Sequence, residues 1–185
     1  MKQFVSTLSK TICEKLISEL TVHEVEPFHG FMSLPADNPF YNDIANQTQM
    51  LLDAGYNDST VEYRHYQSGK HFDKNYENII GGIVGCVPLM CWVSEIRPGK
   101  CTPWHWDVNP WEKEHQQLGE LVRYFCFLSA PAPGHIFVTA KDAYYMEEQG
   151  SIYQYAHIHD WHAGSNVGVT PKFFLTFTGY KTGEF

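Results

Sequence analysis

His105 and Asp107 stand two residues apart in a segment, 101–107, that we expect to form a strand. Side chains at positions i and i+2 of a strand point to the same face. A histidine from a remote strand would complete a two-histidine, one-carboxylate site, which suits iron(II) with open coordination positions. Alone the pair is a weak indication, because two polar residues also occur at the surface end of an ordinary strand.

A second segment, 160–179, supplies a candidate for the remote histidine. His162 is followed by Asn166 at +4, Gly168 at +6 and Lys172 at +10, and then by an alternating strand. With both segments present, the chain resembles the 2-oxoglutarate and iron(II)-dependent oxygenases. That family has a double-stranded β-helix with an early HxD pair and a later histidine followed, ten residues on, by a basic residue. The resemblance covers roughly residues 89–180 and extends to small phage and bacterial members and, more distantly, to the aspartyl/asparaginyl hydroxylase-like branch.

The resemblance implies that His105, Asp107 and His162 hold iron(II), and that 2-oxoglutarate and dioxygen are cosubstrates. His157 and His159 are rival ligands, but only His162 has the asparagine, glycine and basic residue that the family pattern requires. The rivals are expected to be supporting donors or residues at the rim.

Lys172 stands where most of the family has an arginine that binds the distal carboxylate of 2-oxoglutarate. Lysine keeps the charge but loses the planar, bidentate fork. The alternative is an exposed lysine at the start of a strand. Asn166, in the same motif, is grouped with the cosubstrate-binding residues.

Arg123 is the rival anchor, because it lies in an otherwise apolar strand where a charge needs solvent or a partner. Alternation places Arg123 on one face of this strand and Tyr124 on the other. Either Tyr124 donates a hydrogen bond to the cosubstrate while Arg123 faces away, or the reverse holds. The sequence leaves both arrangements open.

The family reaction would oxidise 2-oxoglutarate to succinate and carbon dioxide and hydroxylate an unactivated C–H bond. Halogenating relatives lack the aspartate ligand, so Asp107 favours hydroxylation. The substrate is expected to be an amino acid, a peptide residue or a small metabolite. The loop 108–120 is a candidate lid, and four tryptophans near the ligands are candidates for a wall that excludes water: Trp104, Trp106, Trp111 and Trp161.

Two other functions compete with this one. A non-oxidative metal cupin could use the same barrel for isomerase, lyase or hydrolase chemistry without Lys172. A binding module that keeps the barrel without chemistry is the non-enzyme alternative, and the intact ligand set argues against it. A Cys101 nucleophile beside His105 is weaker than either.

The elements that must position these residues are expected to be mainly strands. Two amphipathic stretches, around 8–20 and 41–54, predict helices that buttress one sheet. Short aromatic and β-branched segments separated by turn residues predict strands near 89–96, 101–107, 121–128, 134–139, 143–146, 151–155 and 173–179. The expected fold is a double-stranded β-helix of the jelly-roll or cupin type in one domain, 1–185, with a mixed N-terminal part, 1–85, and a core, 89–180.

Composition limits the partners and the compartment. A formal net charge of −8 without a long basic run disfavours duplex nucleic acid. Five cysteines without CxxC spacing, with no cationic leader and no apolar run of membrane length, favour a soluble, cytoplasmic protein without a membrane partner. The oligomeric state stays open.

Overall fold

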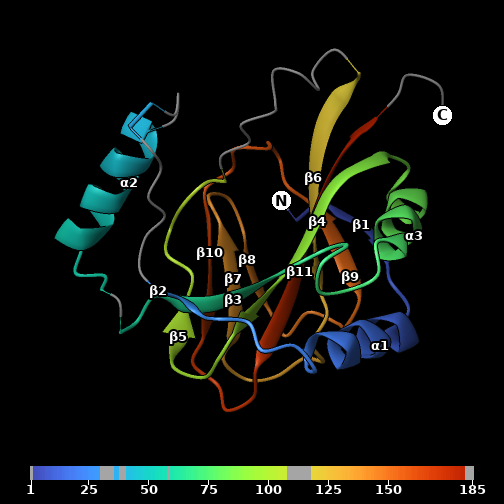
Figure 1. The fold of residues 1–185 in the computed structure, drawn as a ribbon, viewed down its shortest axis with the longest axis horizontal. Helices are drawn as coiled ribbons and strands as arrows, with labels where there is room; N and C mark the ends of the chain where they lie inside the picture. Colours follow the sequence, from blue (N-terminus) through green and yellow to red (C-terminus); the bar gives the residue numbers. More distant parts are fainter. Residues whose placement is uncertain (1, 30–35, 38–40, 58, 108–117, 182–185) are drawn as a thin grey trace.

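A computed structural model describes residues 2–29, 36–37, 41–57, 59–107 and 118–181. Within them the chain folds mainly into antiparallel strands (Figure 1). A larger, seven-stranded sheet has the order β1-β9-β6-β11-β4-β3-β2, and a smaller, four-stranded sheet has the order β5-β10-β7-β8. This mainly β architecture confirms the double-stranded β-helix expected from the sequence.

The larger sheet is built from strands distributed along the whole chain. They are β1 (Phe4–Thr7), β2 (Phe28–His29), β3 (Glu62–Gln67), β4 (Val87–Ile96), β6 (Glu120–Phe127), β9 (Ser151–Gln154) and β11 (Lys172–Lys181). The long strand β11 lies at the centre between β4 and β6, with Thr176 opposite both Trp92 and Phe125. The strands β1, β2 and β3 were not predicted from the sequence.

The smaller sheet contains β5 (Lys100–Cys101), β7 (His135–Thr139), β8 (Ala143–Tyr145) and β10 (His162–Asn166). The strand expected over 101–107 is wrong beyond Cys101. Pro103, which has no backbone N–H, interrupts the ladder. Beyond Cys101 the pairing with β10 continues through the hydrogen bond from the Thr102 N–H to the Gly164 carbonyl (2.8 Å) and the isolated bridge between His105 and His162.

Side chains that point alternately to the two faces of the central strands form two separate hydrophobic cores. On β6, Val122, Tyr124 and Cys126 point to the outer face, where they join an apolar cluster with residues of the helices. Phe125 and Phe127 point between the sheets into an aromatic cluster completed by Phe137, Tyr144, Tyr153, Tyr155 and Phe174. The inner face of the larger sheet is therefore the one that can carry a site.

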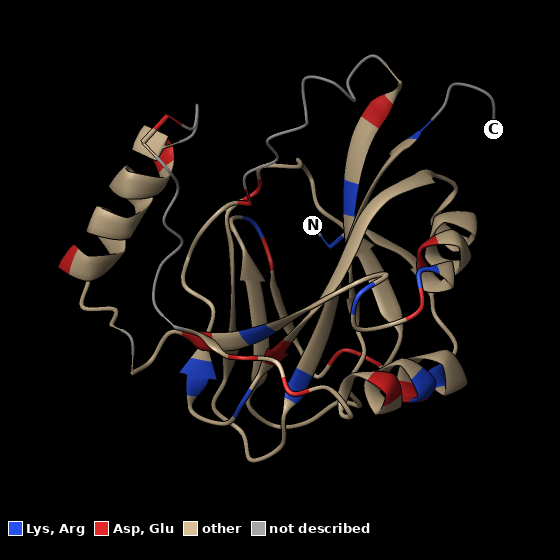
Figure 2. Ribbon diagram, in the orientation of Figure 1, with Lys and Arg blue, Asp and Glu red and all other residues tan. Residues whose placement is uncertain are grey.

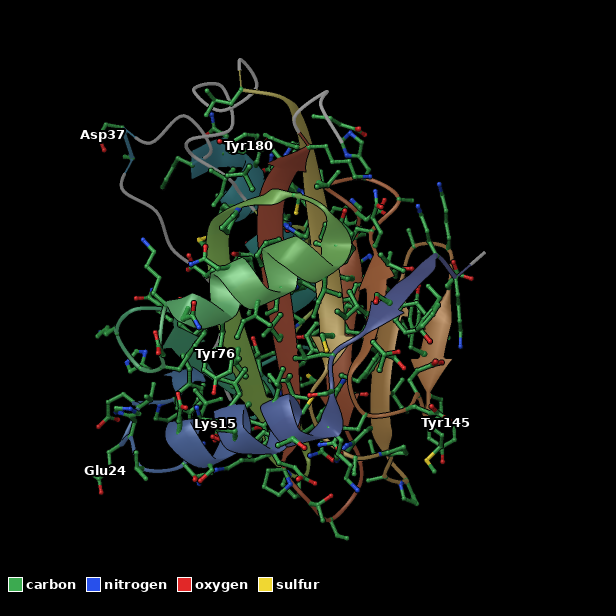
Figure 3. The ribbon with its side chains drawn as sticks, turned by 90° about the vertical axis from the view of Figure 1, so that its right-hand side faces the viewer. Lys15, Glu24, Asp37, Tyr76, Tyr145 and Tyr180 are labelled. Atoms are coloured by element: carbon green, nitrogen blue, oxygen red, sulfur yellow. The ribbon has the colours of Figure 1, made fainter. Side chains whose placement is uncertain are left out.

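Two helices cover the outer face of the larger sheet. α1 (Lys10–Leu20) buries Cys13, Leu16 and Leu20, and α3 (Asn75–Val84) buries Ile80 and Val84 among others. Figure 3 shows both helices across this face, and the Tyr76 hydroxyl of α3 donates a hydrogen bond to Glu19 of α1 (2.9 Å). The prediction of α1 as a buttress is confirmed, whereas α3 was not predicted.

The helix α2 (Tyr41–Asp53) does not buttress this sheet, so that expectation was wrong. It lies on the opposite side of the molecule from α1 and α3 (Figure 1). Its buried side includes Gln47, whose side-chain oxygen accepts a hydrogen bond from the backbone N–H of Trp106 (3.4 Å). Through Gln47, the buried side of α2 contacts the segment that contains the candidate ligands His105 and Asp107.

Charged residues are spread over many elements. Lys and Arg alternate with Asp and Glu along α1 and around α3 (Figure 2). Within the described part of the chain, no helix combines the length and the apolar character needed to cross a bilayer.

Candidate metal centre and its two cavities

The structure brings His105, Asp107 and His162 together. One ligand atom from each lies within 4.8 Å of the others. Asp107 is central, because its Oδ1 is 3.5 Å from His105 Nε2 and its Oδ2 is 3.5 Å from His162 Nε2. With bonds of about 2.1 Å to one ion, neighbouring ligand atoms would be about 3 Å apart. Small side-chain movements that shorten the two 3.5 Å distances would therefore let all three residues bind the same metal.

Backbone carbonyls select the tautomer of both histidines. His105 Nδ1 is 2.7 Å from the carbonyl oxygen of Pro103, and His162 Nδ1 is 2.8 Å from that of Asp160. A carbonyl can only accept a hydrogen bond, so each Nδ1 carries the proton and donates. Each Nε2 is left with its lone pair toward Asp107, which is the arrangement typical of metal-binding histidines.

Electrostatics prepare the three groups as ligands. Burial and the neighbouring His105 lower the pKa of His162 to about 4, so its imidazole is neutral at neutral pH. Burial alone would raise the pKa of Asp107, but Arg123 and the two histidines outweigh it and hold the pKa well below its usual range. Burial alone would lower the pKa of His105, but the hydrogen bond and the negative charge of Asp107 outweigh burial and raise this pKa, so a metal bound there would compete with a proton for this imidazole. Two imidazoles and one carboxylate fit iron(II) and similar divalent ions.

Arg123 holds the carboxylate ligand. It is 1% exposed on the inner face of β6, and its guanidinium donates to Asp107 Oδ2 (2.9 Å), the Ile158 carbonyl (2.8 Å) and the Thr178 hydroxyl (3.2 Å). Of the two arrangements left open for β6, the structure therefore has Arg123 facing inward, at the ligand Asp107.

Tyr124 points to the outer face and packs within the helix-covered core, 1% exposed. Asn166 is fully buried and binds backbone instead, donating to the carbonyls of Ile96 and Thr170 and accepting from the N–H of Gly168. Neither lines the cavity at the candidate ligands, and a contact of either residue with a cosubstrate stays a prediction. Asn166 instead fixes the turn that leads into β11.

A cavity of about 250 Å³ extends from the ligands between the two sheets. Lys172 lies in its wall, 1% exposed, and the Nζ atom donates to the carbonyl of Ile136 and lies 5.4 Å from the ring centre of Phe174. Burial lowers the pKa of Lys172 to about 7. Within the described part of the chain no residue forms an ion pair with Lys172, so its ammonium group has no anionic partner in the cavity wall.

Polar side chains line the path between Lys172 and the ligands. The cavity is lined by Ser94, Thr102 and Thr176 as well as by His105, Asp107 and His162. Gly164 on β10 keeps the space open, because a Cβ there would lie 2.9 Å from Ile96 Cδ1 and 3.4 Å from Lys172 Nζ. Gly164 was not predicted as a site residue, although it lies between His162 and Asn166 in the same motif.

A second cavity, of about 660 Å³, reaches the ligands from another side. Asp107, His65 and Trp92 line both cavities, so the two spaces meet at the carboxylate ligand. His65 and Tyr63, which share one face of β3, were not predicted as site residues. The aromatic residues of the segment 62–67 are nevertheless typical of a strand.

The remaining candidates lie around the centre. The His159 ring packs on Trp106 (5.0 Å between centroids), and His157 Nδ1 accepts from the backbone N–H of His159, so neither joins the ligand group. Trp104 and Trp161 stack on each other (6.1 Å) rather than lining either cavity. Trp111 and most of the expected lid, 108–117, lie outside the described residues.

Comparisons with known proteins show similarity of fold. No protein-family model matches the chain, and no curated protein matches its sequence. Among solved structures, it is similar to a prolyl-4-hydroxylase of Pseudomonas putida (TM-score 0.47, 12% identity, 92% of this chain and 100% of that one). It is also similar to the viral collagen prolyl hydroxylase of Paramecium Bursaria Chlorella virus-1, in complex with 2OG (TM-score 0.46, 15% identity, 97% and 96%).

Proteins with other chemistry share the architecture. One is assigned as a sugar phosphate isomerase in Acidithiobacillus ferrooxidans (TM-score 0.38, 16% identity), and the match covers 64% of this chain and 60% of that protein's length. The neighbours of this double-stranded β-helix thus include both hydroxylases and cupin-type isomerases.

Proposed function

We propose that this protein is an iron(II) and 2-oxoglutarate-dependent dioxygenase that hydroxylates an unactivated C–H bond. One observation carries the proposal: two cavities meet at Asp107, and the smaller cavity contains the buried Lys172, which has no ion-pair partner among the described residues. A dianionic cosubstrate that binds the metal at one end needs such a cation at the other. A metal cupin without this cosubstrate would have no use for a buried lysine in this place.

Each group of residues in the candidate site would have a separate role. His105, Asp107 and His162 would hold iron(II), which supplies the oxidative chemistry when bound. Lys172 would bind the distal carboxylate, and the hydroxyls of Ser94 and Thr176 would line the path of the cosubstrate. Arg123 orients Asp107 and compensates its charge. One oxygen atom of dioxygen enters succinate and the other enters the hydroxylated product, with release of carbon dioxide.

The cavity near Lys172 also limits water around the cosubstrate. Phe137 and Phe174 form an apolar wall around the Nζ atom, at 5.6 and 5.4 Å from their ring centres. An ion pair formed there would be desolvated and therefore stronger than one at the surface. The larger cavity, which meets the other side of Asp107, is left for the substrate.

Calorimetric titration of 2-oxoglutarate tests the proposal without turnover. Manganese(II), which accepts similar oxygen and nitrogen ligands, would replace iron(II). We expect 2-oxoglutarate to bind the manganese-loaded protein and to bind much more weakly to the metal-free protein or to His162→Ala. Equal binding with and without metal would contradict a cosubstrate that bridges the ion and Lys172.

A further inference from the structure

The larger cavity contains a carboxylate that the proposed reaction does not use. Glu77, in the first turn of α3, is 6% exposed and lines this cavity. Among the described residues, no side chain or backbone group forms a hydrogen bond or ion pair with its carboxylate. The start of a helix favours a negative charge, but a buried carboxylate without a counter-ion still has a cost that a bound cation would remove.

The cavity joins Glu77 to the metal ligands around the edge of β4. Cys91 and Trp92 point to opposite faces of this strand, and both line the cavity. β3 covers the same edge only as far as the hydrogen bond from the Ser68 N–H to the Cys91 carbonyl (3.1 Å). A ligand that reaches both Asp107 and Glu77 must therefore be elongated.

Other polar groups of the cavity do not neutralise Glu77. Lys70 and Lys74 also line it, but both are exposed and neither lies within ion-pair distance of the carboxylate. Exposed charges are screened by water and salt and contribute little. The buried Ser68 hydroxyl, also in the lining, has no hydrogen-bond partner among the described groups. Within the described residues, the Glu77 carboxylate thus has no cationic partner and the Ser68 hydroxyl has no hydrogen-bond partner.

We infer that the substrate is an elongated compound with a protonated amine or guanidinium several bonds from the carbon that reacts, and that Glu77 binds this cation. This inference rests on the proposed function, because it assumes that the reacting carbon lies beside Asp107. Both a free basic amino acid and a basic side chain within a peptide have the required chemistry.

Binding of matched cationic and neutral compounds tests the inference. Arginine and citrulline have nearly the same shape but differ in charge, and blocked tripeptides with either residue at the centre separate a peptide substrate from a free amino acid. Calorimetry would use the full chain loaded with manganese(II) and 2-oxoglutarate. We expect the arginine form of at least one pair to bind about 10- to 100-fold more tightly, the range for a charge-assisted hydrogen bond.

Variants assign the preference to Glu77. Glu77→Gln should reduce the ratio of arginine to citrulline affinity to about one. Glu77→Asp keeps the charge, so this ratio should stay above one, and such a result would show that the cavity tolerates substitution at this position. Glu14→Gln removes the same charge from the exposed surface of α1 and should leave the wild-type ratio unchanged. A ratio near one for every pair in the wild type, or a full preference in Glu77→Gln, would overturn the inference.

The two proposals fail in different ways. If 2-oxoglutarate binds with metal but no arginine compound is preferred, the role of Glu77 is wrong and the oxygenase proposal stands. If the arginine preference depends on Glu77 but 2-oxoglutarate does not bind, the cation site stands and the oxygenase proposal is wrong.

Discussion

The charge of Lys172 decides how the cosubstrate would bind. Burial holds its pKa at about 7, so the unliganded lysine loses its proton as the pH rises through neutrality. A dianion binds the protonated form and raises the pKa again. Binding must therefore take up a proton above about pH 7, and the apparent affinity for 2-oxoglutarate should fall, approaching tenfold per pH unit.

Calorimetry between pH 6 and 9 in buffers of different ionisation enthalpy measures this proton uptake. Lys172→Ala should weaken 2-oxoglutarate binding by about one to three decades, because one partner of a desolvated charge pair is lost. Lys172→Arg stays charged over the whole range, so any binding that it retains should not depend on pH in this way. An unchanged affinity in Lys172→Ala would remove Lys172 from the site.

Arg123 would act on a bound metal through its hydrogen bond to Asp107. Replacing it with methionine removes the hydrogen bond to Asp107 Oδ2 and leaves the carboxylate less ordered. Loss of such a supporting contact typically lowers metal affinity by about 10- to 100-fold. Competition with a metal-sensitive dye would measure the affinity of Arg123→Met for manganese(II).

Arg123→Lys is the conservative variant for the same experiment. It keeps the charge but cannot satisfy Asp107, Ile158 and Thr178 together, so an intermediate affinity is expected. If Arg123→Met binds metal normally but loses 2-oxoglutarate, then Arg123 is the anchor after all.

The grouping of His105, Asp107 and His162 could be predicted from the sequence, because the spacing within each motif is local. HxD and the His162 motif each lie within a few residues of one turn or strand. The partners of Arg123 could not be predicted, because Asp107, Ile158 and Thr178 come from distant segments that only the sheet order brings together. The same holds for the unpaired Glu77, whose surroundings depend on where α3 packs.

At the scale of elements, β10 determines the shape of the smaller cavity. Gly164 lies between His162 and Asn166, and its missing side chain leaves room for Lys172 Nζ. Gly164→Ala would place a methyl group 2.9 Å from Ile96 Cδ1, so this side chain or Lys172 must shift. We expect weaker 2-oxoglutarate binding, by about tenfold or more, with metal affinity little changed.

Gly82→Ala is the matched control, because a Cβ at this helical position meets no atom within 4 Å. It should bind 2-oxoglutarate like the wild type and be slightly more stable, since alanine favours a helix by up to about 1 kcal/mol over glycine. Normal 2-oxoglutarate affinity in Gly164→Ala would show that the cavity is larger or more adaptable than the structure indicates.

The local pattern of apolar, polar and turn residues predicted some helices and strands and not others. Alternation and turn residues predicted β4, β6 and β11, which are long and lie in the centre of the sheet. The helix α2 has an amphipathic pattern, but the pattern does not say which surface the helix covers. Its buried Gln47 contacts the backbone of Trp106 through the side-chain oxygen instead of packing on the larger sheet. The sequence pattern did not predict α3, because Gly81 and Gly82 lower the helix propensity of this apolar segment.

At the scale of the whole molecule, the aromatic cluster joins the two sheets. Phe125 is fully buried, and its ring lies 4.8 Å from Phe137 of the smaller sheet and 5.5 Å from Phe174 of β11. Phe125→Ala should reduce the free energy of unfolding by about 3–5 kcal/mol, as expected for a large cavity in a core. Urea denaturation followed by tryptophan fluorescence measures the change.

Phe4→Ala serves as the comparison, because Phe4 on the edge strand β1 is 55% exposed. Its loss should cost much less than that of Phe125, within about 1 kcal/mol. If both variants lose similar stability, the sheets are not held together mainly by the aromatic cluster.

The most direct measurement of the central claim is the consumption of 2-oxoglutarate by the purified protein with iron(II) and ascorbate, in air and under argon. For a 2-oxoglutarate-dependent dioxygenase we expect succinate to form in air in equal amount to carbon dioxide. A suitable substrate should accelerate succinate formation, and argon or the His162→Ala substitution should abolish it. Turnover of a substrate that needs the metal but neither dioxygen nor 2-oxoglutarate would show that the protein is a non-oxidative metal cupin and not a dioxygenase.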